Sequence, residues 1–298
     1  MTVVTGRSGS GKSSLIIGTL LPAVKWSLTN RKTPDPAEGL YKTLTGVESL
    51  ERVVWIDQSP IGRSPRSNPA TFSGVYDEIR RLFAQTKTAK RLGYSSARFS
   101  FNTKGGRCET CQGTGFERVE LNFLPDMFIP CPDCGGKQFN PQTLSVKYKE
   151  KSIADVLAMS IEEATEFFAD IPKIALTLNV MNDLGLGYLR LGQGANALSG
   201  GEAQRLKLSA ELKKCAGDNF ALGGSGETLY VLDEPTTGLH GLDVERLVDV
   251  LRCLTAAGNT VVVIEHNEQV QNAADRIVEL GPGGGRLGGR IISVLDKE

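Results

Sequence analysis

One glycine-rich segment constrains the fold of this chain more than any other feature. The run Gly6-Arg-Ser-Gly-Ser-Gly-Lys12-Ser13 follows a β-prone stretch, Thr2–Thr5, and leads into a helix-compatible one, Lys12–Leu21. Between a strand and a helix, such glycines let backbone amides converge on phosphate oxygens. The pattern predicts a P-loop, and the flanking strand and helix disfavour a chance glycine-rich turn. The predicted nucleotide-binding residues are Gly6, Ser8, Gly9, Ser10, Gly11, Lys12, Ser13 and Ser14.

A second stretch supplies carboxylates for the predicted nucleotide-binding site. The apolar run Thr228–Leu232 ends in Asp233 and Glu234, which is the layout of a Walker B segment. Asp233 is predicted to hold Mg²⁺ together with the Ser13 hydroxyl, while Lys12 reaches the β- and γ-phosphates. Glu234 is predicted to orient and polarise the attacking water. Two acids at the end of a strand can also be ordinary surface charges, but their combination with a P-loop favours a nucleotide site.

The composition argues against membrane-spanning and secreted classes of protein. Of 298 residues, 40% are hydrophobic and 23% charged, and 34 basic side chains balance 34 acidic ones, so net charge predicts no partner. No apolar run approaches transmembrane length, because Val261–Ile264 is long enough only for a buried strand. The N-terminus lacks a charged-then-apolar leader pattern. We expect a cytoplasmic protein that contacts no membrane.

Four of the six cysteines form two Cys-x-x-Cys pairs. Cys108 and Cys111 are separated from Cys131 and Cys134 by nineteen residues, a spacing typical of a structural four-thiolate zinc site. In a reducing compartment such pairs indicate a metal before a disulfide, and a redox dithiol is the alternative. Between the pairs, Phe116–Leu124 alternates enough to predict a hairpin strand. The remaining cysteines, Cys215 and Cys253, lack partners at ligand spacing.

The stretch from 79 to 108 contains eight basic residues and no acidic one. Such a field attracts a polyanion, although a solvated basic face without a ligand is the alternative. Tyr94, Phe99 and Phe101 are interleaved with these charges and could either touch bases or belong to the core. The residues predicted to contact DNA phosphates, without reading the base sequence, are Arg98, Lys104 and Arg107.

Alternating strand and helix patterns frame these motifs and predict an α/β fold. The expected elements are a strand at 53–56, helices at 76–83, 151–191 and 198–215, a strand at 228–232, a helix at 244–257 and a strand at 260–264. Loops are expected at 29–39 and Asp218–Glu227, and a proline- and serine-rich stretch, Ser59–Pro69, leads into a polar region. The predicted divisions are a P-loop core at 1–70 and 198–298, split by an insert at 71–197 that holds a zinc module at 105–140.

Further motifs resemble those of ATP-binding-cassette (ABC) proteins. Leu198-Ser-Gly-Gly-Glu-Ala-Gln-Arg205 is similar to the ABC signature, Gln58 to the Q-loop glutamine and His266 to the switch histidine, while Asp243 lies near the D-loop position. The resemblance implies that Gln58 acts in catalysis and at the Mg²⁺ ion, and that His266 contacts the γ-phosphate. A lone histidine is more often structural or solvated, but His266 directly follows an apolar strand.

In ABC proteins the P-loop of one unit is completed by the signature of another. The resemblance therefore implies a composite site, with the P-loop, Walker B, Q-loop and switch residues on one side. A single chain is expected to bind nucleotide, whereas efficient hydrolysis should need two units. The residues that would serve a facing site are Ser199, Gly200, Gly201 and Glu202.

Three longer stretches, Val54–Asn68, Arg98–Cys111 and Asp233–His240, carry a narrower resemblance that extends over almost all of the chain. They are similar to the C-terminal nucleotide-binding half of the UvrA family, which senses DNA damage in bacterial nucleotide excision repair. The likeness implies an ABC-type P-loop NTPase core with an inserted helical signature region and a zinc-bound β-hairpin module. It also implies ATP, Mg²⁺ and Zn²⁺ as cofactors and double-stranded DNA as a largely sequence-independent partner.

The same resemblance sets expectations for protein partners. UvrA carries two such halves in one chain, so the site should be completed by a homodimer or by a complementary UvrA-type N-terminal half. The UvrB-binding and insertion domains of UvrA lie in its other half, so a UvrB-like partner is expected only indirectly. The chain begins five residues before Gly6, so the antiparallel β layer that ABC domains place upstream is not expected. Arg7 also departs from the family pattern.

Two alternative functions stay open. The first is a zinc-stabilised fragment that binds DNA or protein and holds nucleotide without turnover. The second is a UvrA-like ATPase with a drug-resistance or self-protection role. Cys111-Gln-Gly-Thr-Gly is also similar to the zinc repeats of DnaJ chaperones, but the surrounding ABC motifs disfavour that assignment.

Overall fold

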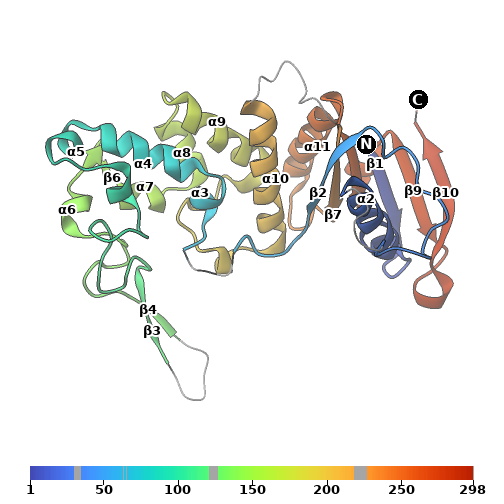
Figure 1. Ribbon diagram of the computed structural model, residues 1–298, viewed down its shortest axis with the longest axis horizontal. Helices are drawn as coiled ribbons and strands as arrows, with labels where there is room; N and C mark the ends of the chain where they lie inside the picture. The colour runs from blue at the N-terminus through green and yellow to red at the C-terminus, as the bar shows by residue number, and fades with distance from the viewer. Residues whose placement is uncertain (30–34, 63, 65, 121–126, 218–226, 298) are drawn as a thin grey trace. The chain divides into compact units, whose positions relative to one another are not determined.

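The computed structural model describes residues 1–29, 35–62, 64, 66–120, 127–217 and 227–297. These residues form two compact units, each with its own core (Figure 1). The sheet unit comprises 1–59, 183–185 and 199–298, and the helical unit comprises 60–182 and 186–198. The loop expected at Asp218–Glu227 lies outside the described residues except for Glu227, which begins a strand.

The sheet unit is built on a mostly parallel β-sheet. Among the described residues, six strands pair in the order β10-β9-β1-β8-β7-β2, and only the β10–β9 pair is antiparallel. Parallel neighbours need crossover connections, which the intervening helices supply. The strands are β1 Thr2–Gly6, β2 Leu50–Ile56, β7 Glu227–Asp233, β8 Thr260–Ile264, β9 Arg276–Gly281 and β10 Arg290–Asp296.

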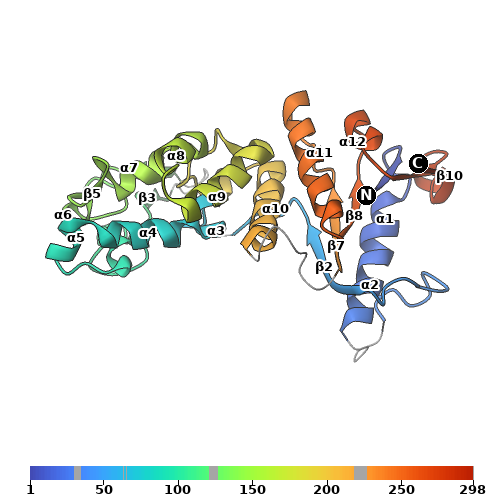
Figure 2. The same ribbon diagram turned by 90° about the horizontal axis from the view of Figure 1, so that it is seen from above.

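Helices cover both faces of this sheet (Figure 2). Val4, Val231 and Ile264 point to the face where the helices after the P-loop pack, and alternate residues such as Val3 and Leu232 are buried on the opposite face. Strands buried on both faces are continuously apolar, which explains the runs Leu229–Leu232 and Val261–Ile264. The helices are α1 Lys12–Leu15, the π-helical turn η1 Ile16–Leu20, α2 Leu21–Leu28, α10 Gly200–Gly217, α11 Gly241–Ala256 and α12 Glu268–Asn272.

Two C-terminal strands, β9 and β10, were not among the expected elements. Their short parallel and antiparallel pairings extend the sheet beyond β1. Side chains of β10 such as Ile291, Ile292 and Leu295 are exposed. Because burial does not favour one face of β10, its sequence lacks the alternation by which strands are usually detected. Residues 282–289, with the short 3₁₀ turn η5 Gly285–Leu287, connect β9 to β10.

The helical unit is made of short helices around an aromatic core. The Phe83 ring contacts the rings of Phe99 and Tyr148, at 5.5 and 6.3 Å between centroids, and Phe101 stacks on Tyr76 at 5.2 Å. Two short hairpins, β3–β4 and β5–β6, complete the unit. Its elements are α3 Pro69–Phe72, α4 Val75–Gln85, α5 Lys87–Arg91, η2 Ser96–Phe99, β3 Phe116–Val119, β4 Met127–Pro130, α6 Pro141–Leu144, β5 Lys147–Tyr148, β6 Lys151–Ser152, α7 Ile153–Ala158, α8 Ile161–Phe167, α9 Pro172–Met181 and η4 Ala195–Ala197, with the π-helical turn η3 Asn182–Leu186 divided between the units.

The region 151–191, expected to be helical, contains several short helices. Ser160 caps α8 through its hydroxyl and the Glu163 carboxylate, and Pro172 occupies the first position of α9. The spacing of apolar residues alone suggested one continuous helical region. These local helix-start signals divide it into separate short helices. No helix within the described ranges is both long and apolar enough to cross a lipid bilayer.

Candidate nucleotide-binding site and cysteine centre

The P-loop connects the end of β1 to the start of α1. Gly6 has φ 133°, and a Cβ there would lie 2.1 Å from the Leu280 carbonyl oxygen, so only glycine fits. The buried Lys12 donates from Nζ to the carbonyls of Gly6, at 2.9 Å, and Arg7, at 3.1 Å. Ser13 and Ser14 are exposed at the helix start, where backbone amides and the helix dipole favour an anion. The predicted loop therefore has the local structure expected of a phosphate site.

Three further predicted residues lie at the carboxyl ends of neighbouring strands. Asp233 ends β7, Glu234 follows it, and His266 comes two residues after β8. Glu234 adopts a left-handed φ of 46°, and its amide donates to the Ile264 carbonyl at 2.9 Å. His266 Nε2 lies 3.9 Å from Glu234 Oε1. Since β1, β7 and β8 are parallel, these side chains and the P-loop share the sheet edge where α/β proteins bind ligands.

A cavity lined by both polar and apolar residues adjoins this edge. Its volume is about 400 Å³, and its lining includes Gly6, Arg7 and His266. Ser293 and Glu279 also line the cavity, and the Ser293 hydroxyl donates to the Glu279 carboxylate at 3.0 Å. Arg7, which departs from the family P-loop pattern, is exposed beside this space. Its side chain adds a positive charge within the phosphate-binding loop.

The surroundings of Asp233 shift the pKa of its carboxyl group. Burial and the neighbouring Glu234 carboxylate raise the pKa of Asp233 above its ordinary value, while the Lys12 ammonium offsets part of the shift. A half-buried acid held beside a second acid is destabilised when ionised. A divalent cation would reverse this effect, because its charge favours the ionised carboxylate. The electrostatics of Asp233 suit the Mg²⁺ role predicted for it.

The Q-loop and signature residues also lie within the sheet unit. Gln58 is exposed after β2 and donates from Nε2 to the Asp233 carbonyl at 3.4 Å. The Ser199 amide donates to the Glu202 carboxylate at 2.6 Å, and the Glu202 amide donates to the Ser199 hydroxyl at 3.3 Å. This reciprocal pair is a capping box that starts α10. A Cβ on Gly201 would lie 2.7 Å from the Thr237 carbonyl, so the second signature glycine permits close packing.

Glu265 is a site residue that the motifs did not reveal. Only 4% of it is exposed, and its carboxylate accepts from the amide and hydroxyl of Thr236 at 3.2 and 2.9 Å. It also accepts from the amides of His266, at 2.8 Å, and Asn267, at 3.2 Å. Glu265 therefore ties the segment after Walker B to the segment that carries His266. An acidic residue at the end of a buried apolar strand was the available signal.

Two residues of α10 link the signature helix to the ends of β2 and β7. The buried Gln204 donates from Nε2 to the carbonyls of Ile56, at 3.0 Å, and Asp233, at 2.8 Å. Lys207 forms an ion pair with Asp57. Burial alone would raise the pKa of Asp57, but hydrogen bonds from Lys207 and Ser59 outweigh it and hold the pKa below its usual range. The sequence showed Gln204 and Asp57 as parts of motifs, but neither their contacts nor the role of Lys207.

The four paired cysteines converge as predicted. Their Sγ atoms all lie within 4.8 Å of one another, with Cys108 3.9 Å from Cys131 and Cys111 3.7 Å from Cys134. Burial and the neighbouring thiols raise the pKa of Cys134 to about 12, so without a metal ion this thiol stays protonated at neutral pH. A bound cation would supply the charge that stabilises thiolates. Four converging sulfurs fit tetrahedral Zn²⁺ as a structural ion with no open coordination position.

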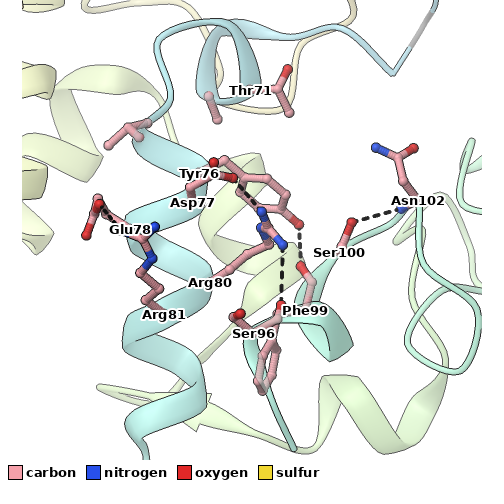
Figure 3. Close-up of polar contacts among 12 residues, drawn as sticks. Thr71, Tyr76, Asp77, Glu78, Arg80, Arg81, Ser96, Phe99, Ser100 and Asn102 are labelled. Atoms are coloured by element: carbon pink, nitrogen blue, oxygen red, sulfur yellow. Dashed lines mark hydrogen bonds and ion pairs between the residues drawn. The ribbon is translucent and has the colours of Figure 1, made fainter.

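The basic stretch at 79–108 is partly engaged in contacts within the helical unit. On α4, Arg81 pairs with Glu78 at 2.5 Å, and Arg80 pairs with Asp77 and also donates to the Ser96 carbonyl at 3.5 Å (Figure 3). These charges are consequently neutralised or directed inward. The exposed basic residues outside these pairs include Lys87, Lys90, Arg91 and Lys104.

The three predicted DNA-contacting residues differ in their surroundings. Arg98 donates to the Thr143 hydroxyl at 3.0 Å and stacks on Tyr94 at 4.4 Å from the ring centroid. Arg107 is paired with Glu109 at 3.2 Å, and only 12% of its side chain is exposed. Lys104 is exposed. Of the three, Lys104 is the one best placed to reach a ligand.

Phe99 and Phe101, for which base contacts and a core position were both open, belong to the core. Both are completely buried. The Phe99 carbonyl accepts a hydrogen bond from the hydroxyl of the buried Tyr76 at 2.6 Å (Figure 3). Their sequence position among basic residues reflects the connection after α5 rather than a stacking surface for bases.

The fold and these motifs define an ABC-type P-loop nucleotide-binding domain with an inserted helical, cysteine-bearing region, as the sequence predicted. No protein-family model matches the chain. It is 55% identical over 293 residues to UvrABC system protein A of Helicobacter pylori, covering 98% of this chain and 30% of that protein. For the same protein from Lactiplantibacillus plantarum the identity is 56% over 291 residues, covering 98% and 29%.

A solved structure gives the same assignment. The crystal structure of UvrA2 from Deinococcus radiodurans superposes with a TM-score of 0.85 at 50% identity, covering 99% of this chain and 34% of that one. In sequence and fold, the chain is therefore similar to part of a UvrA protein. It spans about a third of the length of these relatives. The resemblance to UvrA expected from the sequence is confirmed.

Proposed function

We propose that this chain is the ATP-hydrolysing, DNA-engaging region of a UvrA-type protein that acts in nucleotide excision repair. The observation that carries the proposal is that Asp233 and Glu234, at the carboxyl end of β7, share a sheet edge with the P-loop and its Lys12. ATP and Mg²⁺ are the nucleotide and metal that such a site serves.

The positions of the residues and their resemblance to ABC motifs support the following proposed roles. The P-loop residues Gly6 to Ser14 bind the phosphates, with Lys12 at the β- and γ-phosphates. Ser13, Gln58 and Asp233 hold the Mg²⁺ shell. Glu234 positions and polarises the attacking water, and His266, 3.9 Å from it, contacts the γ-phosphate.

Hydrolysis is proposed to require two nucleotide-binding units. Ser199 caps α10, and Gly200 to Glu202 are its first residues. These four residues serve the P-loop of a facing unit, as their resemblance to the ABC signature implies. That unit is a second copy of this chain or a complementary UvrA-type N-terminal half. UvrB-like proteins contact the assembly only through regions outside this chain.

The helical unit is proposed to engage DNA. The Zn²⁺-clamped cysteines stabilise the base of the β3–β4 hairpin, and exposed basic residues, Lys104 foremost, contact phosphates without reading base sequence. Arg98 and Arg107 act chiefly in holding this surface together, because both are engaged by neighbouring side chains.

ATP turnover against chain concentration, with and without double-stranded DNA and a complementary N-terminal half, tests the proposal. Turnover should be stimulated by DNA and should rise faster than linearly with concentration, since two units form one site. Glu234→Gln should lower the turnover rate by about a hundredfold or more while ATP still binds. Glu48→Gln, an exposed change outside the site, is the matched control.

The rival function is a binding module that holds nucleotide without turnover. It predicts nucleotide binding and DNA binding, but no hydrolysis under any of these conditions and no difference between wild type and Glu234→Gln. A chain that binds ATP yet remains inactive with both DNA and the complementary half would replace the ATPase proposal with this one.

A further inference from the structure

The glycine-rich connection between β9 and β10 packs directly on the P-loop. We call its residues Gly283–Gly289 the glycine strap. The Gly285 amide donates to the Gly9 carbonyl at 3.0 Å, and the Gly289 amide donates to the Ser10 carbonyl at 2.9 Å. These bonds join segments about 275 residues apart in sequence, and both acceptors lie in the middle of the phosphate-binding loop.

Two strap glycines are required by proximity rather than by backbone conformation. Gly284 has φ −102° and ψ 164°, and Gly288 has φ −92° and ψ −163°, extended values that any residue adopts. A Cβ on Gly284 would nevertheless lie 2.7 Å from the Ser8 carbonyl oxygen. A Cβ on Gly288 would lie 3.0 Å from Ser10 Cα and 3.1 Å from the Gly9 oxygen. The absence of side chains at these positions lets two backbones approach within hydrogen-bonding distance.

The two hydrogen bonds set the orientation of P-loop peptides. In a planar trans peptide, the carbonyl of one residue and the amide of the next point in opposite directions. Holding the Ser10 carbonyl on the strap therefore turns the Gly11 amide to the side away from the strap. The Ser10 amide is held within the loop by the Arg7 carbonyl at 3.1 Å. The strap also lines, with Gly9, Gly11 and Ser14, a cavity of about 670 Å³ beside the start of α1.

We propose that the glycine strap is a positioning element that pre-orients the P-loop for phosphate binding. It supplies partners to the Gly9 and Ser10 carbonyls, so that these groups stay directed away from the phosphate side before nucleotide arrives. Pre-organisation of this kind raises affinity because the loop does not have to be ordered during binding. The inference rests on the nucleotide binding proposed above, but the contact between the glycine strap and the P-loop can be tested without nucleotide.

The test compares Gly284→Ala and Gly288→Ala with Gly18→Ala in the complete 298-residue chain. Gly18 is an exposed glycine of η1, where a Cβ meets only the Ser13 oxygen at 3.9 Å, so its substitution controls for loss of a glycine near the site. Hydrogen exchange of the peptide covering residues 6–14 is measured without nucleotide. Affinity for a fluorescent ATP analogue with Mg²⁺ and the thermal midpoint Tm are measured in parallel.

In both strap variants, we expect faster exchange within residues 9–11 and about tenfold weaker binding of the analogue, equivalent to about 1.4 kcal/mol. Gly18→Ala should match wild type in exchange and affinity. Folded strap variants with wild-type exchange and affinity would overturn the proposal, as would weaker binding that merely follows a lower Tm without local exchange at 9–11. If neither strap variant folds, the hydrogen exchange of the Gly285 and Gly289 amides in wild type tests the proposal instead. Unprotected amides there would contradict the hydrogen bonds between the glycine strap and the P-loop. If wild type does not bind the analogue, the proposed nucleotide function fails, while the exchange comparison still tests the strap.

Discussion

His266 Nε2 lies 3.9 Å from Glu234 Oε1, and the segments that carry these two residues are fastened together by one buried carboxylate. One oxygen of Glu265 accepts the amides of His266 and Asn267, and the other accepts the amide and hydroxyl of Thr236. The distance between the proposed general base and the proposed γ-phosphate sensor is thus set by a residue that contacts neither reacting group.

Replacing Glu265 should disturb catalysis through position. In Glu265→Gln, an NH₂ group replaces one carboxylate oxygen. This NH₂ group faces N–H or O–H donors and cannot accept a hydrogen bond from them. We expect a loss of about 1–3 kcal/mol in the free energy of unfolding. We also expect about a tenfold lower ATP turnover rate, because the catalytic side chains are misplaced. Chemical denaturation and steady-state turnover measure the two effects, and Glu268→Gln, on exposed α12, serves as the control. Wild-type turnover in Glu265→Gln would show that the contact does not position the site.

The raised pKa of Asp233 predicts that its removal stabilises the nucleotide-free chain. Because the folded-state pKa lies above the reference value of 3.8, stability falls as pH rises from 3.8 through the folded-state pKa. Asp233→Asn removes this penalty, so Tm at pH 7 should rise by about 2 °C, and the difference should vanish near pH 3. Stabilisation by Mg²⁺ and ATP should be lost in the same variant.

Differential scanning fluorimetry across pH measures this effect, with Asp249→Asn, at an exposed position of α11, as control. A Tm difference that is negative at pH 7, or independent of pH, would contradict the assigned cause of the shift, which is burial next to Glu234.

The cysteine cluster predicts one zinc ion per chain. Cys131→Ser removes one of four converging ligands, so bound zinc should fall well below one equivalent. The Tm of the transition that reports the helical unit should drop by about 5 °C or more, since metal-binding energy contributes to folding. Cys253→Ser is a matched control, because Cys253 is an exposed free thiol outside the cluster. Elemental analysis of reduced protein checks both variants, and less than half an equivalent of zinc in wild type would refute the site.

The helical unit predicts salt-sensitive DNA binding in which Lys104 matters more than Arg107. Each phosphate contact contributes about 0.9 to the slope of log affinity against log salt concentration. Lys104→Ala should reduce the slope by about this amount. Arg107→Ala should reduce it less, because Glu109 already holds the guanidinium. Fluorescence anisotropy of labelled duplex DNA over a salt series measures the slopes, and Lys173→Ala, exposed on α9, is the control. Equal slopes in wild type and Lys104→Ala would remove Lys104 from the interface.

The amino-acid sequence by itself determined the motifs whose geometry is local. The P-loop, the acidic end of β7 and the signature capping box each depend on a few consecutive residues and their backbone preferences, so their patterns were readable. Convergence of the cysteines was also predictable, because each Cys-x-x-Cys turn brings two sulfurs together and a single ion accounts for both pairs. The α/β alternation likewise predicted the strands β1, β2, β7 and β8.

Only the tertiary structure decided which distant residues meet. Phe99 and Phe101 became core residues, and Arg98 became an internal contact, because the helices of their unit close around them. The pairing of β9 with β1 carries the glycine strap onto the P-loop across almost the whole chain. Such contacts depend on strand order and backbone proximity, and neither can be predicted from the local pattern of apolar and polar residues. A glycine that is needed because another backbone lies within 3 Å cannot be distinguished in sequence from a glycine that permits a turn.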